Sequence, residues 1–174
     1  MTRRQVLACA AGASLSGCGF QPVYMPTASG KAGVAERELA AIHVDLMPDR
    51  PGQVLRQALQ RRFEGAGDGV ARRYDLSVGF GLAGEGLAVQ PNSIATRTRL
   101  IGTAYWTLTA QDPGRTKLSS GYAKVVDGYN LFDAQYFTAD LESEALTRRI
   151  AEHLADQITI QLATFFRKQA APKG

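Results

Sequence analysis

The chain has 174 residues, with 20 Lys and Arg against 16 Asp and Glu, a formal net charge of +4. This basic excess is small and scattered, which argues against a nucleic-acid-binding protein, because such proteins gather basic residues on one surface. The two His residues, His43 and His153, cannot form a His/Cys metal cluster alone, and we expect no free thiol to join them, as argued below from the positions of the two Cys residues.

Residues 1–17, MTRRQVLACAAGASLSG, have the features of a signal peptide. Arg3 and Arg4 supply a positive start, and Val6 to Leu15 form a short apolar run. A helix that spans a membrane needs about 20 residues, so we predict that this segment is cleaved rather than kept as an anchor. The arginine pair is compatible with either general or twin-arginine export.

The four residues Leu15-Ser16-Gly17-Cys18 resemble the lipobox of bacterial lipoproteins. In that motif the Cys thiol receives a diacylglycerol thioether, the signal is cut before it, and the new amino group is acylated. A triacylated Cys18 anchors the protein stably, since two acyl chains already suffice. Gly follows Cys18 in place of the Asp that resembles an inner-membrane retention signal, which implies the outer membrane.

Cleavage after residue 17 leaves 157 residues, enough for one domain with a hydrophobic core. Cys9 is lost with the signal and the Cys18 thiol is acylated, so we expect no disulfide and no cofactor beyond the covalent lipid. Residues 18–35 contain Pro and Gly without periodicity and are predicted to be a flexible, lipid-anchored tether. We assign residues 36–169 to a single α+β domain and 170–174 to a disordered tail.

The first predicted strand covers residues 39–47, where Ile42, Val44 and Leu46 alternate with polar residues. A helix is predicted next, over residues 48–67, with Asp49 as its cap. Its apolar stripe comprises Leu55, Ala58, Leu59 and Phe63.

Three further strands are predicted over residues 72–84, 95–110 and 116–129, with a loop at 84–93 and a hairpin turn at 112–114. The first two strands alternate with a period of two, which indicates one buried face. The core-facing side chains are expected to be Tyr74, Leu76, Val78, Phe80 and Leu82, then Leu100, Ala104, Trp106 and Leu108.

A long helix is predicted over residues 134–168 because apolar residues recur every four positions, at Leu146, Ile150, Leu154, Ile158 and Leu162. The order β-α-β-β-β-α requires a parallel first strand pair and antiparallel hairpins afterwards. The predicted fold class is therefore α+β, a two-layer sandwich in which two helices cover one face of a four-stranded mixed sheet. The other face, with Arg97, Arg99, Thr103 and Tyr105, is left for solvent or a partner.

Five pieces of the chain, in their order and spacing, resemble the lipopolysaccharide-assembly lipoprotein family, LptE. They are CGFQPVY, PGQVLRQALQRRF, YDLSVGF, IATRTRLIGTAYWTL, and GYN before the long helix. The resemblance implies a non-enzymatic lipoprotein that plugs the outer-membrane β-barrel LptD, assists its assembly, and takes part in lipopolysaccharide transport to the cell surface. It implies an outer-membrane location, facing the periplasm and the barrel lumen.

The candidate contact residues come from chemistry rather than from the resemblance. Arg side chains hold phosphates and carboxylates, which lipopolysaccharide carries, with two hydrogen bonds each. Arg97 and Arg99 are two residues apart on one predicted strand face, and Lys124 on the neighbouring strand is expected to join them. The alternative is that these residues meet acidic groups on the barrel wall, or water.

No catalytic residue or metal ligand is assigned, because the sequence lacks a G-x-S-x-G motif, a phosphate-cradling glycine loop and a Cys/His pair. The alternative function is a periplasm-facing outer-membrane lipoprotein that binds another envelope partner, such as peptidoglycan or a soluble protein.

Overall fold

A computed structural model describes residues 33–64, 70–89, 95–130 and 136–171. The elements in these ranges are α2 (Val34–Ala40), β1 (Ile42–Val44), α3 (Arg50–Phe63), β2 (Tyr74–Val89), β3 (Ala95–Ala110), β4 (Lys117–Asn130) and α4 (Tyr136–Ala170). The predicted α+β class and the order of the predicted elements are confirmed. The short helix α2, before β1, is an addition that the sequence analysis did not predict.

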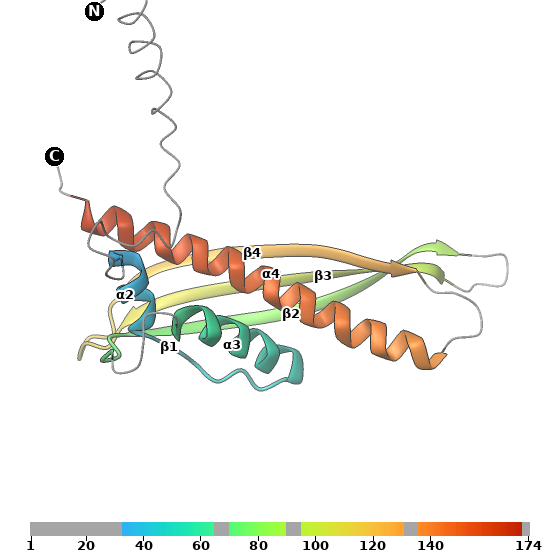
Figure 1. The fold of residues 1–174 in the computed structure, drawn as a ribbon, viewed down its shortest axis with the longest axis horizontal. Coiled ribbons are helices and arrows are strands. Elements are labelled where there is room, and N and C mark those ends of the chain that lie inside the picture. The colour runs from blue at the N-terminus through green and yellow to red at the C-terminus, as the bar shows by residue number, and fades with distance from the viewer. Residues whose placement is uncertain (1–32, 65–69, 90–94, 131–135, 172–174) are drawn as a thin grey trace, which may run out of the picture.

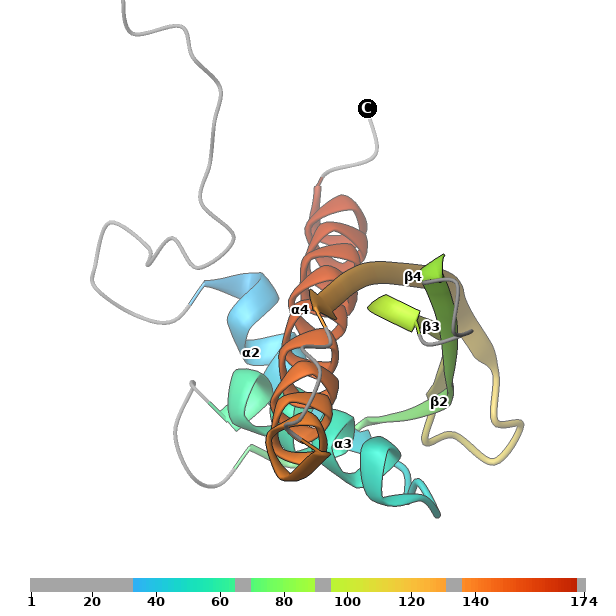
Figure 2. The ribbon, with the colours of Figure 1, turned by 90° about the vertical axis from the view of Figure 1, so that its right-hand side faces the viewer.

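The four strands form one mixed sheet in the order β1-β2-β3-β4. β1 pairs with β2 in parallel, and β2, β3 and β4 follow as antiparallel neighbours. β1 lies beside the first residues of β2, whereas β2, β3 and β4 run together along the length of the molecule (Figure 1). Seen along that length, the helices lie together on one side of the curved sheet (Figure 2).

The core lies between the sheet and the helices, as the alternation of apolar residues predicts. On β3, Ala104, Trp106 and Leu108 are buried while Tyr105 between them is 65% exposed. The apolar stripe of α4 is fully buried at Leu146, Ile150, Leu154, Ile158 and Leu162, and so is the stripe of α3 at Leu55, Ala58 and Leu59. Burial of these side chains is the main term that stabilises the fold.

Two glycines allow α4 and Trp106 to approach the sheet closely. A Cβ added at Gly102 of β3 would lie 2.2 Å from Cγ2 of Ile150 on α4. A Cβ added at Gly121 of β4 would lie 2.5 Å from Cζ2 of the Trp106 ring. The indole N–H of Trp106 donates a hydrogen bond of 2.9 Å to Oε1 of Gln161 on α4, so the buried polar atom is satisfied.

The predicted strand over residues 39–47 is wrong outside Ile42–Val44, because α2 extends to Ala40 and the chain leaves the sheet after Val44. Leu46, which the alternation placed in the core, is 80% exposed, and Met47 is buried instead. Pro48 follows at once and has no backbone N–H for pairing, so the chain turns toward α3.

β2 is longer than predicted, since it continues to Val89 through residues 84–89 that were expected to form a loop. This part is rich in Gly, which weakens intrinsic strand propensity. Pairing with β3 compensates, because Glu85 lies opposite Arg99 and Gly86 opposite Thr98. The register becomes irregular between Gly86 and Val89.

Candidate partner-facing surface

The outer face is the side of the sheet that points away from the helices. Its described residues on the three long strands are Ser77, Gly79, Gly81, Ala83 and Glu85 of β2, Arg99, Ile101, Thr103, Tyr105 and Thr107 of β3, and Ser120, Tyr122, Lys124 and Val126 of β4. They form cross-strand rows, because residues that lie opposite one another in a sheet point to the same face. None of the described helices packs on this side (Figure 2).

An aromatic pair lies in the middle of the outer face. Tyr105 and Tyr122 are direct cross-strand partners, with ring centroids 4.8 Å apart and exposures of 65% and 43%. On the other side of Tyr105 the partner is Gly79, where an added Cβ would meet no atom nearer than 4.0 Å. Val126, one strand repeat beyond Lys124, is 50% exposed. Tyr side chains are enriched at protein interfaces, so the aromatic pair is the part of this face that best marks an interaction site.

Arg99 forms an ion pair with Glu85, its cross-strand partner on β2. The Arg99 side chain is 40% exposed, and its Nε atom is buried without a hydrogen-bond partner among the described residues. A ligand can therefore reach only the exposed part of the guanidinium, and Glu85 already balances much of its charge.

The three predicted contact residues are not one cluster in the described part of the chain. Lys124 is exposed and lies opposite Thr103, while Arg99 lies opposite Gly128. At about 3.3 Å per residue the two rows are about 13 Å apart. The row of Ile101 and Val126 separates them.

Arg97 and Cys18 have a more limited description. The backbone of Arg97 pairs with Ala88 and Asn130, in line with the predicted strand, and nothing is described of its side chain. Cys18, the predicted lipidation site, lies outside the described residues.

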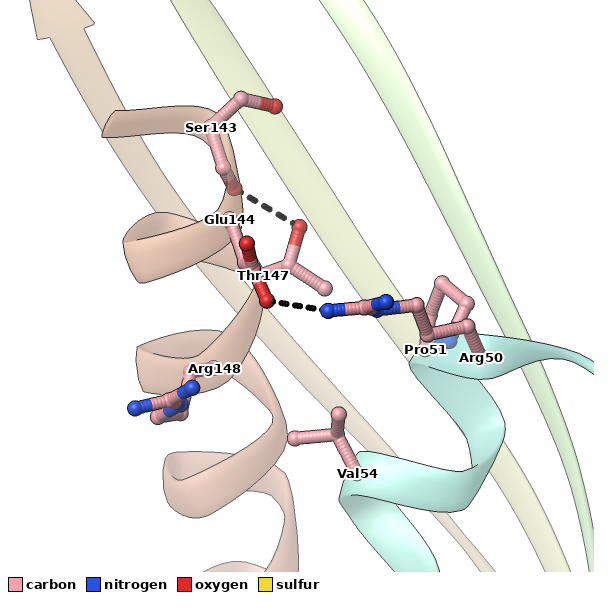
Figure 3. A pocket seen from close by; sticks show the side chains of 7 residues that line it. All are labelled: Arg50, Pro51, Val54, Ser143, Glu144, Thr147 and Arg148. Atoms are coloured by element: carbon pink, nitrogen blue, oxygen red, sulfur yellow. Dashed lines mark hydrogen bonds and ion pairs between the residues drawn. The ribbon is translucent and has the colours of Figure 1, made fainter. Parts of the chain in front are cut away.

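A cleft of 280 Å³ lies between the start of α3 and α4. An ion pair of 2.6 Å between Arg50 and Glu144 crosses it, and Thr147 donates a hydrogen bond of 2.9 Å to the Ser143 carbonyl (Figure 3). The side chains of Arg50, Glu144 and Thr147 are thus partnered within the fold, and the cleft carries no assignment. Within the described ranges no His, Cys, Asp or Glu side chains gather as a metal site, and no helix is long and apolar enough to cross a membrane.

Tyr105 is predicted on the outer face from the sequence, whereas Tyr122 and Val126 are outer-face residues that the prediction did not include. The sequence of the fourth strand contains the pattern that predicts them, because Tyr122, Lys124 and Val126 alternate with the small or apolar residues Ala123 and Val125. Ala123 is buried and Val125 packs against the core, as the period of two requires.

The family model LptE, described as lipopolysaccharide-assembly, matches residues 39–162. Among solved structures, a lipoprotein from Caulobacter crescentus CB15 is 22% identical, with a TM-score of 0.64 over 79% of this chain and 98% of the other. Rare lipoprotein B from Shewanella oneidensis is 15% identical, with a TM-score of 0.53 over 74% of this chain and 96% of the other. At these identities the two structures support the fold. No curated protein sequence matches the chain.

Proposed function

Because this chain belongs to the LptE lipopolysaccharide-assembly family, we propose that it is an outer-membrane lipoprotein that plugs an LptD-type β-barrel. In this role it assists assembly of the barrel and takes part in lipopolysaccharide transport and insertion at the cell surface. The protein acts by binding and positioning, and it has no catalytic task. The acyl chains on Cys18 hold it at the membrane.

The observation that carries the plug proposal is the uncovered outer face of the sheet. Its hydroxyl groups, from Ser77, Thr103, Thr107 and Ser120, suit the polar interior of a large barrel. Tyr105 and Tyr122 combine an apolar ring with a polar hydroxyl, the property that enriches Tyr at protein interfaces. We therefore propose this face as the surface that meets the barrel wall.

This face also carries Arg99 and Lys124, and we propose that they contact lipopolysaccharide together with Arg97, which the alternation of the sequence assigns to the same face. Lys124 is exposed, and the Arg99 side chain is 40% exposed while it is paired with Glu85. Their separation along the sheet suits a long ligand with several phosphates or carboxylates better than one small anion.

Replacing Cys18 with Ala is expected to remove the lipid and leave a soluble or mislocalised precursor, because no thiol remains for the diacylglycerol transfer. Fractionation of cells into membranes and soluble protein measures this. Cys9→Ala is the matched control, since Cys9 lies in the predicted signal and its replacement should leave membrane partitioning unchanged. Unchanged partitioning of the Cys18 variant would contradict the lipobox prediction.

Replacing Tyr105 and Tyr122 together with Ser is expected to lower the amount of barrel retained by the tagged protein at least tenfold, about 1.4 kcal/mol of binding free energy. The fold should stay intact because both rings are exposed. Ile160→Ser is the control, since Ile160 is 51% exposed on α4, away from the outer face. Equal retention by the control and the double Tyr variant would show that the outer face does not hold the barrel.

Changing Arg97, Arg99 and Lys124 together to Gln is expected to weaken lipopolysaccharide binding by the purified protein about tenfold or more. The control changes three Arg residues on the helix side to Gln, namely Arg50, Arg61 and Arg149. In the structure these residues pair with Glu144, Glu152 and Asp127. Both triple variants lower the net charge by three, so a general electrostatic effect would weaken both alike. That result would refute a specific contact on the outer face.

A further inference from the structure

The edge of β2 is open beyond the short strand β1. β1 pairs with Tyr74, Asp75 and Leu76 of β2, and the last main-chain bond on this side runs from the Asp45 N–H to the Leu76 carbonyl, 3.0 Å. From Ser77 onward no described strand lies on that side, although β2 continues to Val89 (Figure 1).

In a strand, the N–H and carbonyl groups of successive residues point alternately to its two sides, which tells which groups of β2 face the open edge. Leu76 points its carbonyl toward β1, so every second residue along β2 points its N–H and carbonyl to the same side. These residues are Val78, Phe80, Leu82 and Gly84. The residues between them point theirs toward β3. The open edge therefore presents a row of main-chain donors and acceptors, the chemistry that another extended strand complements.

The opposite edge of the sheet is protected in a way that β2 is not. On β4 the outward carbonyls of Tyr122 and Lys124 accept hydrogen bonds from Gln161 and Gln157 of α4, at 3.1 and 3.4 Å. Natural sheets also guard their edges with Pro or charged residues. The stretch SVGFGLAG, residues 77–84, contains neither.

A cleft of 280 Å³ opens beside this edge, between Met47, Asp49 and Pro51 on one side and Val78, Phe80 and Leu82 of β2 on the other. Its lining is mainly apolar, so it suits an apolar side chain of an added strand. Asp49 brings a carboxylate to the cleft, and as the N-cap residue of α3 it makes no side-chain capping bond. A basic residue of the added strand would find its partner there.

We propose that the open edge of β2 binds an extended segment of a partner protein as a fifth strand, with an apolar side chain in this cleft and a Lys or Arg beside Asp49. Charge complementarity argues against a second copy, because residues 77–84 of another β2 offer no basic residue. The described part of the chain begins at Gly33, and Val34 lines a pocket with Tyr74 and Ala170 at the other end of β2, away from the cleft. The proposal rests on the proposed function only in that the partner is sought in the outer-membrane assembly, and it does not require the outer face to meet a barrel.

Residue-resolved amide hydrogen exchange of the full chain tests whether a strand is added at the edge of β2. The exchange is measured first in the isolated protein and then in the assembly extracted from outer membranes. In the isolated protein, the amides of Val78, Phe80 and Leu82 should exchange faster than those of Gly79 and Gly81. In the assembly, the first three should slow at least tenfold while the other two change little. Strand addition produces this period of two, whereas general burial would slow all five.

A matched pair of variants tests the edge independently. Leu82→Pro removes the outward N–H and places a ring where the added strand would lie, and Gly81 before it has no Cβ to clash with the ring. Leu82→Ala loses comparable packing and keeps the N–H. The Pro variant should be retained in the assembly at least tenfold less than the Ala variant.

Several outcomes would overturn the proposal. Exchange at Val78, Phe80 and Leu82 that is equally fast in the assembly and in the isolated protein would exclude an added strand. If these three amides are already protected in the isolated chain at every concentration, the chain's own N-terminal segment is what occupies the edge. Protection that grows with the concentration of the isolated chain would identify a second copy.

Discussion

Replacing Trp106 with Ala is expected to lower the free energy of unfolding by about 3–5 kcal/mol, the usual cost of truncating a large core aromatic residue. The indole is 4% exposed, lies against the backbone at Gly121 and bonds to Gln161 of α4. The truncation therefore leaves a cavity between the sheet and α4 and also leaves the Gln161 amide without this partner.

Denaturant unfolding of the variants measures this effect. Trp106→Phe should cost less than Trp106→Ala, since it keeps most of the ring and loses one hydrogen bond of about 0.5–1.5 kcal/mol. Tyr105→Ala, at the neighbouring residue that faces outward, should cost only about 1 kcal/mol, the worth of its cross-strand pair with Tyr122. Equal stability of the Trp106→Ala and Tyr105→Ala variants would contradict the placement of the two rings.

Replacing Gly102 with Ala is expected to destabilise the fold by about 1–3 kcal/mol, because the added methyl group overpacks the contact between β3 and α4. The new Cβ would lie 2.2 Å from Ile150 Cγ2 and 3.2 Å from Leu154 Cδ1. Either α4 moves away from the sheet or Ile150 leaves its rotamer, and each response weakens the core.

Gly84→Ala is the matched control in the same sheet, since its Cβ would have an ordinary 3.6 Å contact with Leu100. A double-mutant cycle with Ile150→Ala sharpens the test, because removing Cγ2 makes room for the new methyl group. The two changes together should cost at least 0.5 kcal/mol less than the sum of the single changes. Additive costs, or equal costs at Gly102 and Gly84, would contradict the close helix–sheet contact.

The long elements were predictable because their periods are clear. The alternation in β3 gave its bounds, residues 95–110, and identified Trp106 as buried and Tyr105 as exposed, which the structure confirms. The four-residue repeat of α4 identified the helix face that is fully buried. In both elements local propensity and tertiary packing favour the same structure.

Short elements and cross-strand contacts were not predictable to the same degree. α2 has seven residues, and its sequence VAERELA follows a glycine-rich stretch that resembles a tether. It is held by tertiary contacts instead, since Ala35 and Leu39 are buried and Glu38 accepts hydrogen bonds from Arg73 and Tyr74. Burial and the bond to Glu38 raise the pKa of Tyr74.

The outer face was predicted in part. Alternation placed Arg99 on it, but its partner Glu85 lay in a stretch that was expected to be a loop, so the ion pair was missed. The distance between Arg99 and Lys124 depends on the register of β3 and β4, which the side-chain pattern of either strand does not contain. The open edge of β2 likewise follows from the length of β1, which the prediction overestimated.

The proposed role as a barrel plug can be tested by isolating the full chain, tagged at its C-terminus, from detergent-extracted outer membranes. Mass spectrometry then identifies the proteins that accompany it. We expect an equimolar complex with a heat-modifiable LptD-type β-barrel. Recovery of the lipidated chain as a free monomer, from cells whose barrel is intact, would contradict it.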